Sequence, residues 1–371
     1  MTSPYCCFLV VTPGQESLAL SELKSKFLQK DYQAETLRGG VQLTTDNLAL
    51  VYSLNHYLKI PTRILLRLSQ FRSTDGVHFY KQVEGLPWSQ ILCGKSVRWR
   101  VTSRSSRLNN AKYLESKAQE ALDAYVKKHP LKKGARSFDI QEIFIRVFRD
   151  EVEISLDTTG DPLYRRGLKK LSVEAPMRES HAAACLTEMN FFESGAQLLD
   201  PFCGSGTVLF EAATFFQKIK SRAFTYQGFR KNFAVTAAYK VELKQPDLRL
   251  IGSDVSPTAI QAATGNAESA KVEVDFKVKS AEDYTSGDIG EPLMVLSNPP
   301  YGDRVGLESD GATMHEVIEK LLMTLQPMKA GFLLPTKFQP KSLQGYKVKR
   351  PLSFKNGGID VNLFVYTRGG R

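Results

Sequence analysis

The chain has 371 residues, of which 42% are hydrophobic and 24% are charged, and its formal net charge is +11. This length allows two or three domains with cores of their own, and the composition is that of a globular protein. No run of about 18 apolar residues could span a bilayer, and the first residues lack the basic region and cleavage site of a signal peptide. We therefore expect a cytoplasmic protein without a membrane partner.

The cysteines and histidines form no pattern that indicates a disulfide framework or a metal site. There are five of each, with no CxxC spacing among the cysteines and with the histidines in separate segments. We expect reduced thiols and no bound metal.

Positive charge is concentrated in the first half of the chain. Residues 1–170 contain 27 Lys and Arg against 17 Asp and Glu, which gives +10, whereas residues 171–371 contain 23 against 22, which gives +1. A basic half joined to a near-neutral half is typical of a polyanion-binding module attached to a catalytic one.

The first half is predicted to contain two small α+β segments, residues 1–71 and 72–155. In the first segment we expect strands at 5–12 and 63–71, helices at 16–28 and 47–58, and a β-rich stretch between the helices. In the second segment we expect helices at 77–83 and 113–128, and strands at 96–103, 140–148 and 152–157.

Basic side chains flank the long predicted helix and a later turn. They are Arg104 and Arg107 before that helix, Lys127, Lys128, Lys132 and Lys133 at and after its end, and Arg165 and Arg166 in the turn. A solvated surface would explain such charges, and the alternative is contacts with RNA phosphates, which position RNA without reading its sequence.

From residue 175 the pattern changes to alternating helices and strands, as in a doubly wound parallel sheet. The chain then closes with a predicted β-hairpin around Asn356-Gly357-Gly358. A final antiparallel hairpin is unusual for dehydrogenases and is expected of class I methyltransferases. The fold class predicted for this half is therefore an α/β, Rossmann-like methyltransferase domain.

A glycine loop follows the first predicted strand of this half. It consists of Asp200, Pro201, Phe202, Cys203, Gly204, Ser205, Gly206 and Thr207. Such a loop lets the backbone approach a ligand closely and directs helix N–H groups at it, although a tight turn alone would also explain it. The third glycine of the dinucleotide motif is missing.

Acidic residues at the ends of two strands indicate what the loop would hold. The carboxylate of Asp200 could meet the ammonium group of a methionine moiety, and Asp254 could accept both hydroxyls of a ribose. Asp254 could instead cap the following helix, but Ser256 already fits that role. Val255, next to Asp254, is expected to contact the same ligand. After the third strand, Ala281, Glu282 and Asp283 would border an adenine ring.

The sequence Asn298-Pro299-Pro300-Tyr301 follows another apolar run. An exocyclic amine of a base is a poor nucleophile, because its lone pair is delocalised into the ring. The side-chain oxygen of Asn298 and the carbonyl of Pro299 could accept its two N–H groups, and Asn298 would also border the cofactor. Pro299 and Pro300 stiffen the loop, and Tyr301 offers a face on which an extruded base could stack.

With these motifs the chain resembles the THUMP-containing RNA guanine-N2 methyltransferases, in particular the bacterial large-subunit rRNA branch. The similar segments are 8–16, 155–167, 175–179, the glycine loop, and Asn298 to Arg304. The resemblance implies a ferredoxin-like unit at 1–71, a THUMP RNA-binding domain at 72–155, a junction at 156–174 and the methyltransferase domain at 175–371. It also implies S-adenosyl-L-methionine as cofactor and 23S rRNA as substrate.

Several alternatives to this function remain open. Enzymes that act on tRNA are near relatives of the rRNA branch, and the Asn-Pro-Pro-Tyr motif also occurs in adenine-N6 methyltransferases. A protein that binds RNA without catalysis is a fourth possibility, although intact Asp200, Asp254 and Asn298 argue against decay of the site.

Overall fold

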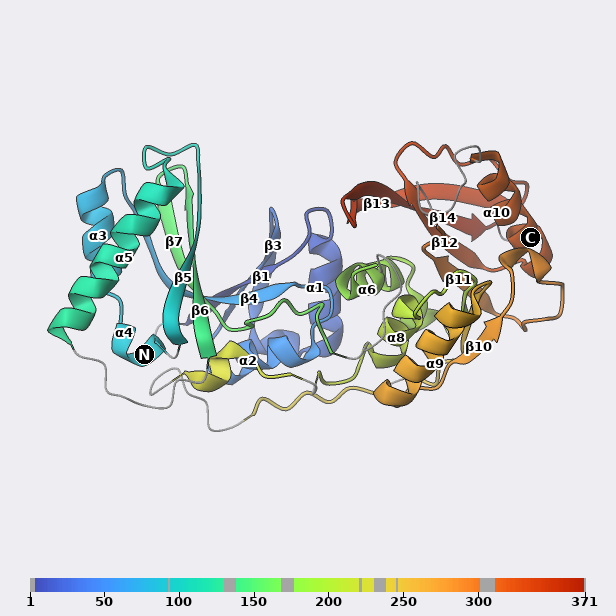
Figure 1. Cartoon of the computed structure of the whole chain (residues 1–371), viewed down its shortest axis with the longest axis horizontal. Helices are drawn as coiled ribbons and strands as arrows, with labels where there is room; N and C mark the ends of the chain where they lie inside the picture. The colour runs from blue at the N-terminus through green and yellow to red at the C-terminus, as the bar shows by residue number, and fades with distance from the viewer. Residues whose placement is uncertain are drawn as a thin grey trace. The chain divides into compact units, whose positions relative to one another are not determined.

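The computed structural model describes residues 4–92, 94–129, 138–167, 177–219, 222–229, 238–244, 246–300 and 311–369. The chain divides into two compact units (Figure 1). The first unit consists of residues 1–11, 27–163 and 222–241. The second consists of residues 12–26, 164–221 and 242–371. The predicted segments are contiguous, whereas in the structure each unit includes a short segment from the other half of the chain.

The first unit is built on one seven-stranded sheet that runs through both predicted segments, with the strand order β2-β3-β1-β4-β7-β6-β5. Its strands are β1 Tyr5–Val10, β2 Gln33–Leu37, β3 Gly40–Thr45, β4 Arg63–Arg72, β5 Gly94–Arg104, β6 Phe138–Phe148 and β7 Glu151–Asp157. Its helices are η1 Gln29–Asp31, α2 Leu48–Tyr57, α3 Gly76–Glu84, α4 Trp88–Ile91, α5 Ala111–Lys128 and η2 Thr225–Gly228.

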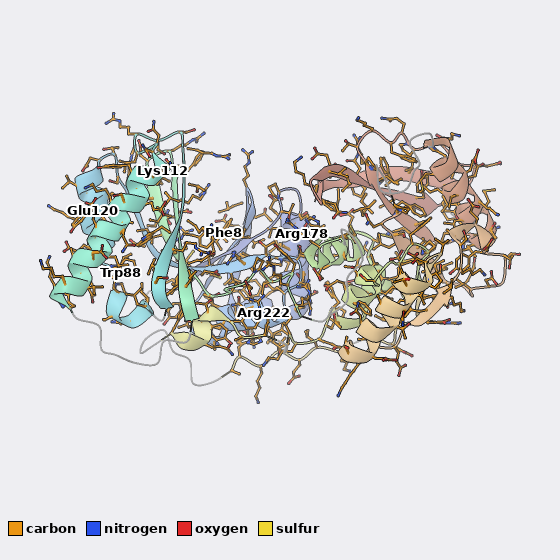
Figure 2. All side chains as sticks on the ribbon, viewed as in Figure 1. Phe8, Trp88, Lys112, Glu120, Arg178 and Arg222 are labelled. Atoms are coloured by element: carbon orange, nitrogen blue, oxygen red, sulfur yellow. The ribbon has the colours of Figure 1, made fainter. Side chains whose placement is uncertain are left out.

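Three of these helices begin where a side chain satisfies the free N–H groups of the first turn. Asn47 accepts from Ala49 and Leu50 at the start of α2, and Asp75 and Asn110 play the same part for α3 and α5. The short α4 escaped the sequence analysis because four residues are too few for a helical pattern. Its Trp88, labelled in Figure 2, is completely buried.

One face of this sheet is apolar across six strands. Residues directly opposite one another share a face, and the row Trp99, Ile143, Leu156, Leu66, Cys7 and Leu43 crosses from β5 to β3 with every member buried. Apolar residues of α2, α3 and α5, among them Leu54, Phe79 and Leu114, are buried as well. Helices and sheet therefore share one core, and the neighbouring residues along each strand point to the opposite face.

The second unit has a seven-stranded sheet with the order β10-β9-β8-β11-β12-β14-β13. Its strands are β8 Gln197–Asp200, β9 Leu250–Asp254, β10 Asp275–Val278, β11 Leu293–Ser297, β12 Lys329–Pro335, β13 Tyr346–Asn356 and β14 Ile359–Arg368. Its helices are α1 Glu16–Lys26, α6 Glu179–Glu188, α7 Phe191–Ser194, α8 Thr207–Thr214, α9 Pro257–Ala270, η4 Ala281–Asp283 and α10 Gly311–Leu325.

Strands β10, β9, β8, β11 and β12 are parallel, and β14 and β13 complete the sheet in antiparallel pairing. This confirms the predicted α/β fold with a mostly parallel sheet and a final antiparallel hairpin. The apolar residues of α10, such as Ile318 and Leu322, form one buried cluster with Val295, Phe332 and Phe364 of the sheet. In the part of the chain that the structure describes, no helix is long and apolar enough to cross a membrane.

Buried charges hold α1 and the start of the second unit in place. Lys26 donates from Nζ to Glu22 Oε1 at 2.6 Å and to the carbonyl of Phe215 at 2.7 Å, and burial lowers its pKa. Arg166 pairs with Glu211 on α8 through two hydrogen bonds of 2.8 Å, and both side chains are 1% exposed.

The prediction that Arg166 contacts RNA phosphates is therefore corrected. Its guanidinium is enclosed and already occupied by a carboxylate, so it cannot reach a polyanion. The neighbouring Arg165 is exposed.

The pair of Arg166 and Glu211 provides a stability test. Removing one member leaves a buried charge without its partner, which costs about 3–5 kcal/mol. We expect Arg166→Ala to lower the free energy of unfolding of the second unit by that amount in urea denaturation. The matched change Arg165→Ala at an exposed position should have little effect, and equal losses in the two variants would contradict the role of the pair.

Candidate active site

The two predicted motifs meet at the carboxyl ends of neighbouring parallel strands. β8 lies between β9 and β11, so the chain proceeds to one side of β8 for β9 and β10 and then returns to its other side for β11 and β12. In open α/β sheets, ligands bind at such a topological switch point. The glycine loop follows β8, and Asn298 follows β11.

The glycine loop has the backbone conformation that its sequence requires. Gly206 has φ +87°, and a Cβ atom there would lie 2.8 Å from the ring of Phe210. Cys203 donates its N–H to the carbonyl of Ser253 at 2.9 Å, and Gly204 donates to Asp254 Oδ2 at 3.0 Å. The loop is therefore bound to the end of β9.

Within this loop the hydroxyl of Ser205 is buried and has no hydrogen-bond partner among the described residues. An unsatisfied buried hydroxyl costs about 1–3 kcal/mol, which a polar ligand group could recover. Pro201, Cys203 and Thr207 are also buried, Phe202 and Gly204 are partly exposed, and Thr207 begins α8.

Asp254 stands at the end of β9 with its carboxylate partly exposed. Besides Gly204, it accepts the N–H of Ser256 at 2.9 Å, and these contacts fix its orientation. Ser256 caps α9 by accepting from Ala259, as the sequence predicts, so Asp254 is not needed as the cap. Val255 is 68% exposed beside it.

Asp200 connects the two motifs. Its Oδ1 accepts a hydrogen bond from the hydroxyl of Ser297 on β11 and another from the N–H of Phe202 at 3.2 Å. The residue is 2% exposed. Burial raises the pKa of Asp200 to about 7, and the charge of Asp254 acts in the same direction, against the two hydrogen bonds.

The segment after β10 lies at the same edge of the sheet, because β10 pairs in parallel with β9 and Val278 is opposite Asp254. Ser280 caps the short helix η4 by accepting from Glu282. Ala281 is buried, and Glu282 and Asp283 are exposed. The polar side chains predicted at an adenine edge therefore reach solvent here.

Asn298 is partly exposed at the end of β11. Its Oδ1 lies 3.4 Å from Nδ2 of Asn356, the last residue of β13, which donates to it. Pro299 is buried and Pro300 is exposed. Tyr301, the fourth residue of the predicted catalytic set, lies outside the described residues.

The structure adds two residues that the sequence analysis missed. Ser297 fixes Asp200, and Asn356 contacts Asn298. Ser297 directly precedes the Asn298 motif, so its place in the sequence could have identified it as a site residue. Asn356 is 58 residues away from Asn298 in the chain, and the two come together because the hairpin pairs with β12, the neighbour of β11.

The remaining predicted RNA contacts belong mainly to the first unit. Arg104, Arg107, Lys127 and Lys128 are exposed, and Lys128 also pairs with Glu84 at 2.6 Å. Lys132 and Lys133 lie outside the described residues.

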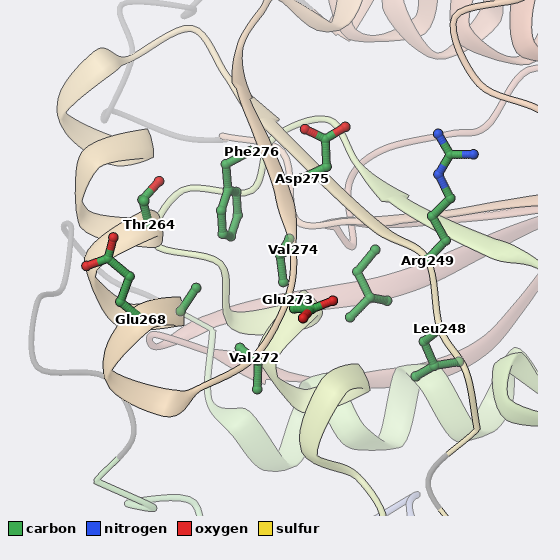
Figure 3. A pocket seen from close by; sticks show the side chains of 11 residues that line it. Leu248, Arg249, Thr264, Glu268, Val272, Glu273, Val274, Asp275 and Phe276 are labelled. Carbon is green, nitrogen blue, oxygen red and sulfur yellow. The ribbon is translucent and has the colours of Figure 1, made fainter.

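A cavity of about 550 Å³ opens beside α9 and β10 (Figure 3). It is lined by Arg249 and Leu250 at the start of β9, by Asp275 at the start of β10, and by Glu268 of α9. It therefore lies at the amino ends of these strands, away from the glycine loop, and does not belong to the active site. Among the described residues, no three His, Cys, Asp or Glu side chains are grouped as a metal site requires.

Comparison with known proteins identifies the family. A family model described as "RMKL-like, methyltransferase domain" matches residues 166–361, more than half of the 371-residue chain. The chain belongs to this family. The cofactor of this methyltransferase domain is therefore S-adenosyl-L-methionine, as the sequence predicts.

Two curated relatives are named ribosomal RNA large subunit methyltransferase K/L. The protein of Psychromonas ingrahamii is 28% identical over 326 residues, which cover 83% of this chain and 43% of that protein. The protein of Colwellia psychrerythraea is 26% identical over 388 residues, which cover 97% of this chain and 52% of that protein. The chain thus spans about half the length of the curated relatives that it matches.

A solved structure with the same fold is SMU.472, a putative methyltransferase complexed with SAH. It superimposes with a TM-score of 0.78 and 22% sequence identity, and the match covers 100% of both chains. The fold described for this methyltransferase-family chain is therefore shared over its whole length.

The raised pKa of Asp200 predicts how stability depends on pH. An aspartate with a pKa near 3.8 when unfolded and about 7 when folded stays protonated in the fold, so its contribution to stability falls as pH rises between these values. Asp200→Asn keeps the acceptor oxygen and cannot ionise. We expect this variant to be more stable than the original protein at pH 8, with the difference shrinking toward pH 4.5. A difference in the free energy of unfolding that is independent of pH would contradict the burial effect.

Proposed function

We propose that this methyltransferase transfers a methyl group from S-adenosylmethionine to the exocyclic N2 amine of a guanosine in RNA, with 23S rRNA as the substrate. The observation that carries the proposal is the meeting of the glycine loop and Asn298 at one edge of the sheet, linked through Asp200 and Ser297. The names of the two relatives support rRNA as the substrate.

The residues at the carboxyl ends of β8 and β9 fit the cofactor. Gly204 and Gly206 have the positive φ angles that the loop needs, and the buried hydroxyl of Ser205 has capacity for a polar ligand group. Asp254, oriented by Gly204 and Ser256, would accept the ribose hydroxyls, and Asp200 would face the methionine ammonium. Val255, Ala281, Glu282 and Asp283 would surround the adenine.

When bound, S-adenosylmethionine supplies the methyl group in an electrophilic form. The chain's own contribution is to position the amine for attack. Asn298 Oδ1 and the Pro299 carbonyl would accept the two N–H groups of the amine, which favours a pyramidal nitrogen with an available lone pair. Asn356 keeps the Asn298 amide in place from β13. The methylated nitrogen then loses a proton to solvent, so no strong general base is needed.

The first unit would deliver the RNA. We infer a ferredoxin-like unit at residues 1–71 and a THUMP domain at 72–155, joined by residues 156–174 to the catalytic domain. The exposed Arg104, Arg107, Lys127 and Lys128 are suited to phosphate contacts, which supply affinity without sequence preference. A target in an unpaired loop is expected, because a base edge within an RNA duplex is inaccessible to the chemistry.

A tRNA substrate would use the same chemistry, and adenine N6 is also an exocyclic amine that Asn298 and Pro299 could hold. The rRNA proposal ranks above both because of the two relatives' names, and above a non-catalytic role because Asp200, Asp254 and Asn298 are all present.

Separate substitutions of Asn298 and Asp254 test this division of roles. Asn298→Ala should lower kcat about 10²- to 10³-fold, because it removes an acceptor needed in the transition state, with little change in cofactor affinity. Asp254→Ala should raise the cofactor Kd about 10- to 100-fold, because hydrogen bonds to a charged acceptor are lost.

Calorimetric titration with S-adenosylhomocysteine and single-turnover kinetics would measure the two effects. Glu282→Ala changes an exposed residue near the same edge of the sheet. It should weaken cofactor binding less than Asp254→Ala does. A loss of cofactor affinity in Asn298→Ala equal to that in Asp254→Ala would refute the assigned roles.

A further inference from the structure

The face of the first sheet opposite its helices contains a cavity of about 770 Å³. It is lined from β2 and β3 across β1, β4 and β7 to β6 and β5, and the exposed Glu115 of α5 also lines it. None of the basic residues singled out from the sequence lines it. Its volume lies within the range of pockets that hold small ligands, roughly 300–1,000 Å³. We call it the sheet-face cavity.

Aromatic rings form part of its lining. Phe8 of β1, labelled in Figure 2, and Phe144 of β6 are each partly exposed. Phe8 lies over Gly40 of β3, where a Cβ atom would be 2.6 Å from the ring. The missing side chain at Gly40 thus lets the Phe8 ring lie against the sheet, with space left above it.

Guanidinium groups surround the rings on the same face. Arg67 and Arg146 share the carboxylate of Glu153 at 3.1 and 3.3 Å, and Arg100 pairs with Glu142 at 2.6 Å. Glu142 is also shared with Arg63 and Arg98, both at 3.3 Å.

These pairs, with that of Arg63 and Asp157, set five guanidiniums against three carboxylates. Positive charge therefore exceeds negative charge among these groups. Arg100 and Arg146 keep 49% and 53% of their side chains exposed, so both can meet a further anion.

We propose that the sheet-face cavity binds an unpaired nucleotide of the RNA substrate, with its base against Phe8 or Phe144 and its phosphates at Arg100 and Arg146. The inference rests on the proposed function in taking RNA as the ligand. A nucleotide has a flat base next to a charged phosphate, and the cavity has aromatic rings next to guanidiniums. Other sheet faces with exposed aromatic residues recognise single-stranded RNA by stacking bases on the rings.

The arrangement favours unpaired over paired nucleotides. Only a base that has left its stack can place its face on a ring, whereas a duplex presents phosphates and groove edges alone. Arg104 lies on the same face of β5 as Arg98 and Arg100, because alternate residues of a strand share a face. The strand would thus continue from the cavity toward Arg104 and Arg107.

The test uses the full chain and a fluorescently labelled hexaribonucleotide without self-complementarity, with affinity measured by anisotropy at several salt concentrations. The double variant Arg100→Gln/Arg146→Gln should bind at least tenfold more weakly. Its slope of log affinity against log salt should fall by about 1.4, which corresponds to two lost phosphate contacts on a single strand. Phe144→Leu should bind about tenfold more weakly with an unchanged slope, because stacking is lost and charge is not.

Arg72→Gln is the matched control, since Arg72 is an exposed arginine of β4 that does not line the cavity. Thermal denaturation of each variant checks that the fold is kept. Pocket variants that bind like the Arg72→Gln protein would overturn the proposal, as would a duplex or inorganic phosphate that competes as well as the hexamer.

The two proposals fail separately. Hexamer binding that depends on Arg100 and Arg146 but comes with no methyl transfer to RNA would support the cavity and refute the proposed reaction. If the protein methylates RNA and the variants of the sheet-face cavity bind the hexamer normally, only the proposed role of this cavity is refuted.

Discussion

The hydrogen bond between Ser297 and Asp200 joins the two loops on which the account of the active site depends. It crosses from β11 to β8, so the glycine loop and the Asn298 loop leave the sheet side by side. Two backbone donors, Cys203 and Gly204, then bind the glycine loop to the end of β9. The glycine loop and Asn298 are thereby held on three neighbouring strands, a rigid support of the kind that catalysis by positioning requires.

The buried position of Asp200 disfavours the ionised form of its carboxylate. A carboxylate in a buried site loses its hydration, and the nearby charge of Asp254 adds repulsion. A cationic group of a bound ligand would offset both effects. The ionised carboxylate of Asp200 is therefore less stable in the unliganded protein than beside such a ligand. The buried charges of Lys26 and Arg166, by contrast, are already paired with Glu22 and Glu211.

Sequence patterns revealed the elements and motifs whose signal is local. The glycine loop, Ser256 as a helix cap and the alternation of strands and helices all depend on neighbours in the chain, and the structure has them where predicted. The sequence pattern predicts the first strand of the hairpin only at 353–355, whereas β13 begins at Tyr346. Lys347, Lys349 and Pro351 interrupt the apolar pattern of this strand at the edge of the sheet. The burial of Arg166 and the contact of Asn356 with Asn298 depend on tertiary packing and could not be foreseen.

The identity of the methylated nucleoside distinguishes methylation of guanine N2 from that of adenine N6. Purified protein would be incubated with isotopically labelled S-adenosylmethionine and unmodified rRNA or tRNA, and the digested nucleosides would be resolved by mass spectrometry. We expect labelled N2-methylguanosine from 23S rRNA. Labelled N6-methyladenosine, or no label in either RNA, would contradict this expectation.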